Sequence, residues 1–297
     1  MNRKQTITGY FLVIFSAVVF GCLPLLVKGI YAEGVNSLST ILFRNLLSAP
    51  VAGLIALRQH GSLKIPRKAL PSVAAIGIMG CCVAPLLLFS SYSFLASGTA
   101  TIFHFIYPAA VVVGGILCYR EKLTGGYLLS VLLCVAGICL FYTPGEPLDP
   151  WGSALALLSG VAYAVYILLL SHFRYRKIRG YLLSFYVFSI NAAVMLLVCL
   201  AGDLLTLPRS FTGWVLCFVL ALVVNVGAVA MFQQGTFLIG GPRAAVLSTL
   251  EPITSVFLGA LVLQETMSLG SGLGSVLVIA ASVLIVFLDL RKEKTDR

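Results

Sequence analysis

Apolar runs of about 20 residues follow one another along almost the whole chain, and they constrain the fold more than any motif does. As a helix, such a run crosses a hydrocarbon core roughly 30 Å thick. The 297 residues are 60% hydrophobic and only 10% charged, whereas soluble domains carry about 25% charged residues. The chain is therefore predicted to be an all-α integral membrane protein.

Glycine, proline and charged residues separate these runs and predict ten transmembrane helices. The first run, Ile7 to Val27, is longer than a signal-peptide core and has no small-x-small cleavage site, so we interpret it as a retained helix. The expected ranges are 8–30, 37–57, 70–91, 96–118, 124–142, 151–172, 180–201, 212–238, 243–263 and 269–288.

The basic residues predict the orientation of these helices. Of the 20 Lys and Arg, 17 fall on the side of the N-terminus, Lys28 and Arg209 fall on the other side, and Arg44 lies within a helix. Because cytoplasmic loops are enriched in Lys and Arg, both termini are predicted to be cytoplasmic. The net charge of +10 is spread over short loops and forms no folded basic module, so no nucleic-acid partner is expected.

The two halves of the chain repeat each other. A shift of 144 places Pro108 over Pro252 and Tyr107 over Glu251, and a shift of 143 places Phe20 over Tyr163. Residues 1–145 and 146–297 are thus predicted to be two five-helix repeats. Because each has an odd number of spans, the second should be inverted relative to the first, as in many secondary carriers.

Two matching segments, YPAAVVVGGILCYREKLT and EPITSVFLGALVLQETMS, together with LFRNLLSA around Arg44, resemble the paired EamA domains of the drug/metabolite transporter superfamily. The resemblance covers nearly the whole chain. It implies two inverted five-helix repeats around a central cavity, and export or uptake of small metabolites such as amino acids. A bacterial inner membrane is the expected location.

Helical spacing gathers polar side chains into a candidate substrate cavity. Ser248, Glu251 and Ser255 share one face of the ninth predicted helix, and the sixth and eighth helices add further polar and aromatic groups. Each of these has a plainer interpretation, because Tyr and Ser in membrane helices commonly bond neighbouring helices; His104 could be a packing residue, a ligand contact or a proton carrier. The predicted cavity residues are Arg44, His104, Tyr107, Tyr163, Tyr166, Asn225, Gln233, Ser248 and Glu251.

Glu251 is the most costly of these residues, since a carboxylate near the membrane centre is rare and often marks a transport route. One interpretation is coupling by protonation, in which Glu251 takes a proton from one side and releases it to the other. The alternative is a fixed partner for Arg44 or for backbone opened by Pro252. Arg44 itself could bind an anionic group, pair with Glu251, or reach polar groups near an interface.

The motifs exclude an enzyme and favour a carrier. The chain has no H-E-x-x-H, G-x-S-x-G or P-loop, and no second membrane-embedded acid accompanies Glu251. No cofactor or metal is expected, and the eight cysteines form no C-x-x-C pair. The prediction is a secondary transporter that moves a neutral or zwitterionic small molecule, either with or without coupling to protons, with efflux as the expected direction and a channel or a membrane sensor as the alternative. Oligomeric state is left open.

Overall fold

A computed structural model describes residues 3–95, 97–120, 125–140, 148–175, 178–262 and 269–295, and these ranges contain helices and no strand. The all-α prediction is confirmed. The first half contains α1 (Arg3–Phe20), α2 (Leu23–Ala32), α3 (Ser37–His60), η1 (Arg67–Ala69), α4 (Leu70–Gly77), η2 (Ile78–Val83), α5 (Ala84–Ser91), α6 (Ser97–His104), α7 (Tyr107–Tyr119) and α8 (Gly125–Cys139). The second contains α9 (Pro150–Ser171), α10 (Tyr181–Ala201), α11 (Phe211–Val219), η3 (Leu220–Val229), α12 (Ala230–Ile239), α13 (Gly241–Ser248), α14 (Glu251–Val262) and α15 (Leu269–Thr295).

Seven helices of the described chain are long and apolar enough to cross a membrane. Two shorter apolar helices accompany them, Gly125–Cys139 and Gly272–Leu288. The seven spans are Gln5–Ala32, Ser37–His60, Arg67–Ser91, Thr99–Tyr119, Pro150–Ser171, Tyr181–Ala201 and Phe211–Ile239.

Three of the predicted helices, 8–30, 96–118 and 243–263, are interrupted in the structure. Each second piece begins with a proline in its first turn, Pro24 in α2, Pro108 in α7 and Pro252 in α14. A proline lacks the backbone donor that would continue the preceding helix, but it fits well at a helix start. From the sequence, a local opening of the helix is predicted only at Pro252.

The breaks in the two halves coincide under the repeat. α6 ends at His104 and α7 begins at Tyr107, while α13 ends at Ser248 and α14 begins at Glu251. Each of these boundaries lies 144 residues from its counterpart, which is the shift that aligns the two sequences. The internal repeat therefore extends to the irregular backbone.

A second pair of irregularities follows the repeat. The π-helical segment η2 lies between α4 and α5, and η3 lies between α11 and α12. A shift of 143 carries residues 78–83 onto 221–226, which lie within η3. Such wide turns inside α-helices frequently occur at functional sites.

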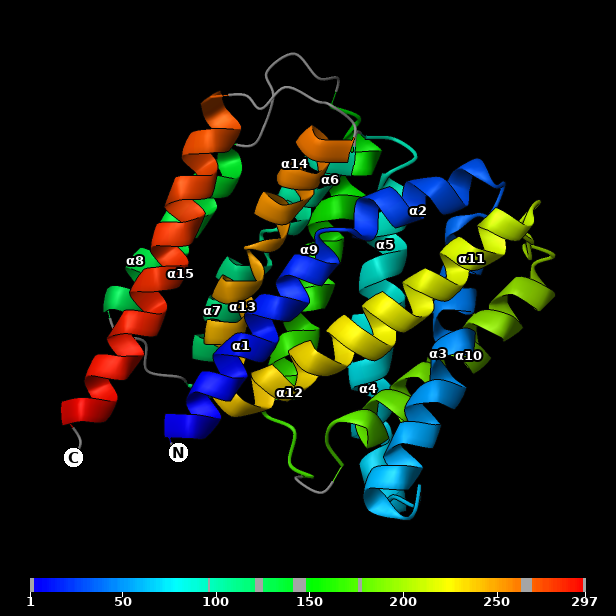
Figure 1. Ribbon diagram of the computed structural model, residues 1–297, viewed down its shortest axis with the longest axis horizontal. Coiled ribbons are helices and arrows are strands. Elements are labelled where there is room, and N and C mark those ends of the chain that lie inside the picture. The colour runs from blue at the N-terminus through cyan, green and yellow to red at the C-terminus, as the bar shows by residue number, and fades with distance from the viewer. Residues whose placement is uncertain are drawn as a thin grey trace.

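The two repeats pack into each other rather than side by side as separate units. α1 of the first half packs mainly against α12 of the second, and α9 of the second half packs against α5, α7 and α6 of the first. Further close pairs are α3 with α10 and α8 with α15, and Figure 1 shows the latter pair along one edge. The predicted boundary between residues 145 and 146 falls outside the described residues.

Gly160 allows α9 to approach the α6/α7 break. A Cβ atom at this position would lie 2.4 Å from the carbonyl oxygen of His104, which is backbone and cannot rotate away. We expect Gly160→Ala to lower the free energy of unfolding by about 1–3 kcal/mol through overpacking, measured by thermal or denaturant unfolding in detergent. Gly272→Ala is the matched control, because a Cβ there meets nothing within 4 Å. An equal loss for both variants would contradict this account of the break.

Candidate functional site

A cavity of about 60 Å³ lies where the helical irregularities of the two repeats meet. Leu23 begins the second piece of the broken first span, Cys81 belongs to η2, His104 ends α6, Val229 ends η3, and Glu251 begins α14; all five residues line the cavity. Non-helical backbone at membrane depth is tolerated where it is buried in protein or borders a cavity. The position of the helix interruptions is therefore consistent with their role in lining this cavity.

Glu251 is the one carboxylate among the residues described around this cavity. It is the first residue of α14, where the positive end of the helix dipole favours a negative group. Its side chain is partly exposed, and in the described chain no ion pair joins it to Arg44. The structure thus differs from the alternative in which Glu251 serves as the fixed partner of Arg44.

Arg44 is held instead by Asn225. The Arg44 side chain is 3% exposed, and its Nε and Nη2 atoms both donate to Asn225 Oδ1, the former over 2.9 Å. Asn225 Nδ2 donates back to the Arg44 carbonyl oxygen over 3.0 Å. This reciprocal bond ties α3 to η3, and burial of the guanidinium rules out the alternative in which it reaches groups near an interface.

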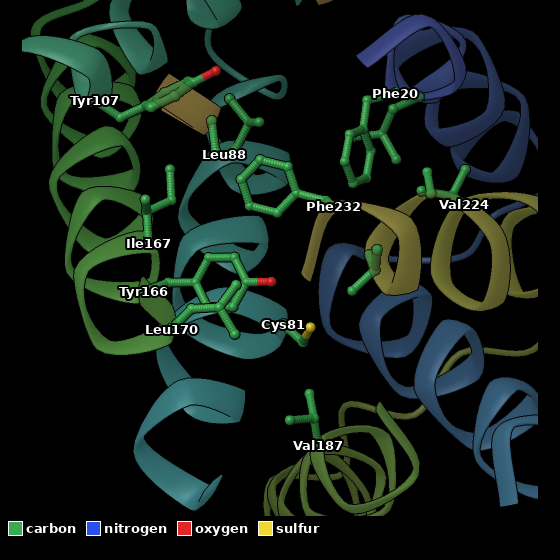
Figure 2. Packing of buried hydrophobic residues seen from close by; sticks show 14 of the residues in the cluster. Phe20, Cys81, Leu88, Tyr107, Tyr166, Ile167, Leu170, Val187, Val224 and Phe232 are labelled. Carbon is green, nitrogen blue, oxygen red and sulfur yellow. The ribbon is translucent and has the colours of Figure 1, made fainter. Parts of the chain in front are cut away.

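An aromatic cluster lies at the cavity: Phe20, Tyr163 and Tyr166 line it, and Phe232 packs against all three. Phe232 is fully buried and lies 5.9 Å from the Tyr163 ring, 6.1 Å from the Tyr166 ring and 6.4 Å from the Phe20 ring, centroid to centroid. Figure 2 shows Phe232 between Tyr166 and Phe20. Gly80 makes room for Tyr166, because a Cβ on Gly80 would lie 2.3 Å from that ring.

His104 reaches the cavity from the end of α6 and is anchored by Ser159. The two side chains are joined over 2.8 Å between His104 Nδ1 and Ser159 Oγ, and Ser159 Oγ donates to the Ala156 carbonyl oxygen over 2.6 Å. Since the single serine proton goes to Ala156, the hydrogen between the two side chains belongs to Nδ1. A neutral His104 then keeps an accepting Nε2 atom.

The remaining predicted residues lie beside the cavity and not on its surface. Tyr107 donates to Ser248 Oγ over 2.7 Å and so joins α7 to α13 across the two repeats. Gln233 Oε1 accepts from Ser184 over 2.9 Å, and its amide lies beside the Tyr166 hydroxyl without a hydrogen bond of normal geometry. The predicted residues that line the cavity are Arg44, His104, Tyr163, Tyr166 and Glu251.

The third span, Arg67–Ser91, contributes no residue to the predicted cavity, although η2 and α5 supply several of its lining residues. Gly80, Cys81, Pro85 and Phe89 all line it. A signal was present, because the repeat shift of 143 carries Phe89 onto Phe232, a residue on a helix that had been selected. The Ser255 side chain, which was expected on the Glu251 face, lies outside the described residues.

The repeated halves, the apolar spans and a polar cavity at the helix breaks define a polytopic membrane protein of the architecture that secondary transporters use. The chain belongs to the EamA-like transporter family, which matches residues 7–143 and 150–287. This family lies within the drug/metabolite transporter superfamily, as the sequence motifs indicated.

Similar proteins span the full length of the chain. It is 26% identical to the uncharacterized inner membrane transporter YicL of Salmonella typhimurium, over 97% of this chain and 98% of that one. It is 27% identical to the uncharacterized transporter YcbK of Bacillus subtilis, over 99% and 96%. A crystal structure shares the fold with a TM-score of 0.79 and 17% identity, over 99% of this chain and 100% of that one. The protein is a multi-pass protein of a bacterial inner membrane, and its family is one of transporters.

Proposed function

We propose that the protein is a secondary-active carrier that moves a small neutral or zwitterionic solute by alternating access. In this proposal ten helices form two inverted repeats, and both termini are cytoplasmic. The excess of Lys and Arg on the terminal side supports this orientation. Both chain ends lie at the same end of the molecule in Figure 1, as an even number of crossings requires.

The observation that carries the proposal is the pair of equivalent helix breaks that meet at one cavity. Each repeat supplies one break, and Tyr107 and Ser248 bond the two together. Broken helices that border a site at the repeat interface are typical of carriers, in which one repeat rocks against the other. Two equivalent breaks would allow the repeats to exchange conformations and open the cavity to each side in turn.

Equivalent pairs of large apolar residues in the two repeats support such an exchange. Tyr166, which lines the cavity, packs against Phe232, and the repeat shift of 143 assigns this pair the counterparts Leu23 and Phe89, which both line the cavity. In the proposal these two pairs are gates, and closing one accompanies opening the other.

The charges around the cavity favour an uncharged or zwitterionic solute. Arg44 is already bonded to Asn225, and Glu251 supplies the acidic group on the opposite repeat. A polyanion would find too little positive charge, whereas aromatic rings and a single carboxylate suit an amine-bearing or neutral molecule. Glu251 is also the proposed site of proton coupling, and efflux is the proposed direction on the family resemblance.

Alkylation of Cys81 tests whether the cavity holds the solute. Cys81 lines the cavity, whereas its neighbour Cys82 contacts Met195 Sδ over 3.4 Å and does not. Two variants are made, each retaining one of these thiols and no other cysteine. We expect a transported amino acid or metabolite to slow alkylation of Cys81 several-fold and leave Cys82 unchanged. A transported solute that protects neither thiol, or both equally, would contradict the proposed site.

A further inference from the structure

A second hollow lies beside α13, and its lining shares no residue with that of the solute cavity. It measures about 360 Å³, and its floor is formed by Leu247 and Leu250. α1 contributes Ile14 to one wall, and α15 contributes Val283 and Phe287 to the other. The floor residues flank Ser248 and Glu251, so the hollow lies directly behind the α13/α14 break.

This hollow is a groove because α1 and α15 stand apart. α1 packs mainly against α12 and α13, while α15 packs mainly against α8. Figure 1 shows α13 and α14 between α1 and α15. The groove between the two walls therefore ends on Leu247 and Leu250.

The exposed faces of α1 and α15, the two helices that border the groove, indicate what covers it. Exposed apolar side chains follow α1 at Ile7, Phe11 and Phe15, and follow α15 at Val276, Ile279 and Val283. Both stripes repeat every three or four residues, so each forms one continuous helix face. In a membrane protein such faces contact lipid hydrocarbon, and the groove between them opens to that hydrocarbon and not to water.

We propose that this groove binds one acyl chain of a membrane lipid. Its lining is apolar except for Ser282, whose buried Oγ has no hydrogen-bond partner in the structure. Water entering such a groove would gain almost no hydrogen bonds, whereas a hydrocarbon chain would fill it with dispersion contacts. A chain bound there contacts Leu247 and Leu250 and supports the α13/α14 break from behind.

Fluorescence quenching by brominated lipid tests the proposal. The only tryptophans, Trp151 and Trp214, are replaced by phenylalanine. A single tryptophan is then introduced by Phe287→Trp in the groove or by Phe11→Trp on the exposed stripe of α1, a control that does not line the groove. The proteins are reconstituted in phosphatidylglycerol and phosphatidylethanolamine with brominated chains, then transferred to the same lipids without bromine.

Both tryptophans should be quenched in brominated membranes. After transfer, Phe287→Trp should retain several times more quenching than Phe11→Trp, because a chain in the groove exchanges slowly. Adding Ser282→Phe fills the groove and should remove the retained quenching, while a normal thermal unfolding midpoint shows that the variant folds. Equal loss of quenching at both positions would mean bulk lipid only. Absence of quenching from the start in Phe287→Trp would mean that protein, such as a second copy, covers the groove. Either result would overturn the proposal.

Discussion

Replacing Glu251 with glutamine is expected to abolish solute transport driven by a proton gradient in proteoliposomes, while the protein remains folded. Glu251 is the one carboxylate among the residues described around the cavity, and it is not paired with Arg44. Glutamine has the same size and hydrogen-bonding reach but cannot gain or lose a proton. The substitution therefore removes titration and leaves the shape of the cavity almost unchanged.

The matched control for this variant is Tyr107→Phe, at the equivalent position of the other repeat. It removes the hydroxyl that bonds Ser248 but no titrating carboxylate. We expect Tyr107→Phe to slow transport and keep its dependence on the gradient, whereas Glu251→Gln should still exchange solute in the absence of a gradient. Full gradient-driven transport by Glu251→Gln would contradict a coupling role for this residue.

Asn225→Leu is expected to produce the largest loss of stability. It removes the acceptor of two Arg44 donors and leaves a guanidinium buried without its partner. Asparagine is neutral, so the loss is that of hydrogen bonds to a buried charged group, each worth about 1.5–3 kcal/mol. Unfolding of the purified protein in detergent, followed by temperature or denaturant, should show a loss of this size.

A second buried asparagine provides the comparison. Asn191 Nδ2 donates to the carbonyl oxygens of Gly77 and Val187 but contacts no charged group, so Asn191→Leu should cost only about 1–2 kcal/mol. Combining Asn225→Leu with Arg44→Met removes the stranded charge and should recover most of the stability. If Asn225→Leu cost no more than Asn191→Leu, or if the double variant were no more stable than Asn225→Leu, Asn225 would not hold the arginine.

The repeat made the larger architecture predictable from sequence. Pro108 and Pro252 are 144 residues apart. In the structure, two residues separate α6 from α7 and two separate α13 from α14, so the two breaks are equivalent. Hydropathy located the seven long apolar helices of the described chain, because a helix must be apolar over about 20 residues to cross a bilayer. The break before Pro24 could not be predicted from the repeat, because α9, the equivalent helix of the second repeat, is continuous.

The details of the site were less accessible. The partner of Arg44 depends on η3, because a π-helical segment changes which side chains face a neighbouring helix. The spacing of apolar residues in the sequence does not reveal such a segment. Asn225 lies within that segment, so helical spacing could not select it over Glu251 as the partner. Aromatic residues such as Tyr163 were easier to predict, because α9 is a regular helix and their spacing on one face is preserved.

Solute counterflow in proteoliposomes tests the central claim most directly. Vesicles are loaded with an unlabelled solute that protects Cys81, and a trace of the same solute in labelled form is added outside. A carrier with alternating access should accumulate the label inside the vesicles transiently above its external concentration. After unlabelled solute leaves to the outside, the cavity faces outward, binds labelled solute and carries it inward. Equilibration of the label without any such overshoot would identify a channel and contradict the account.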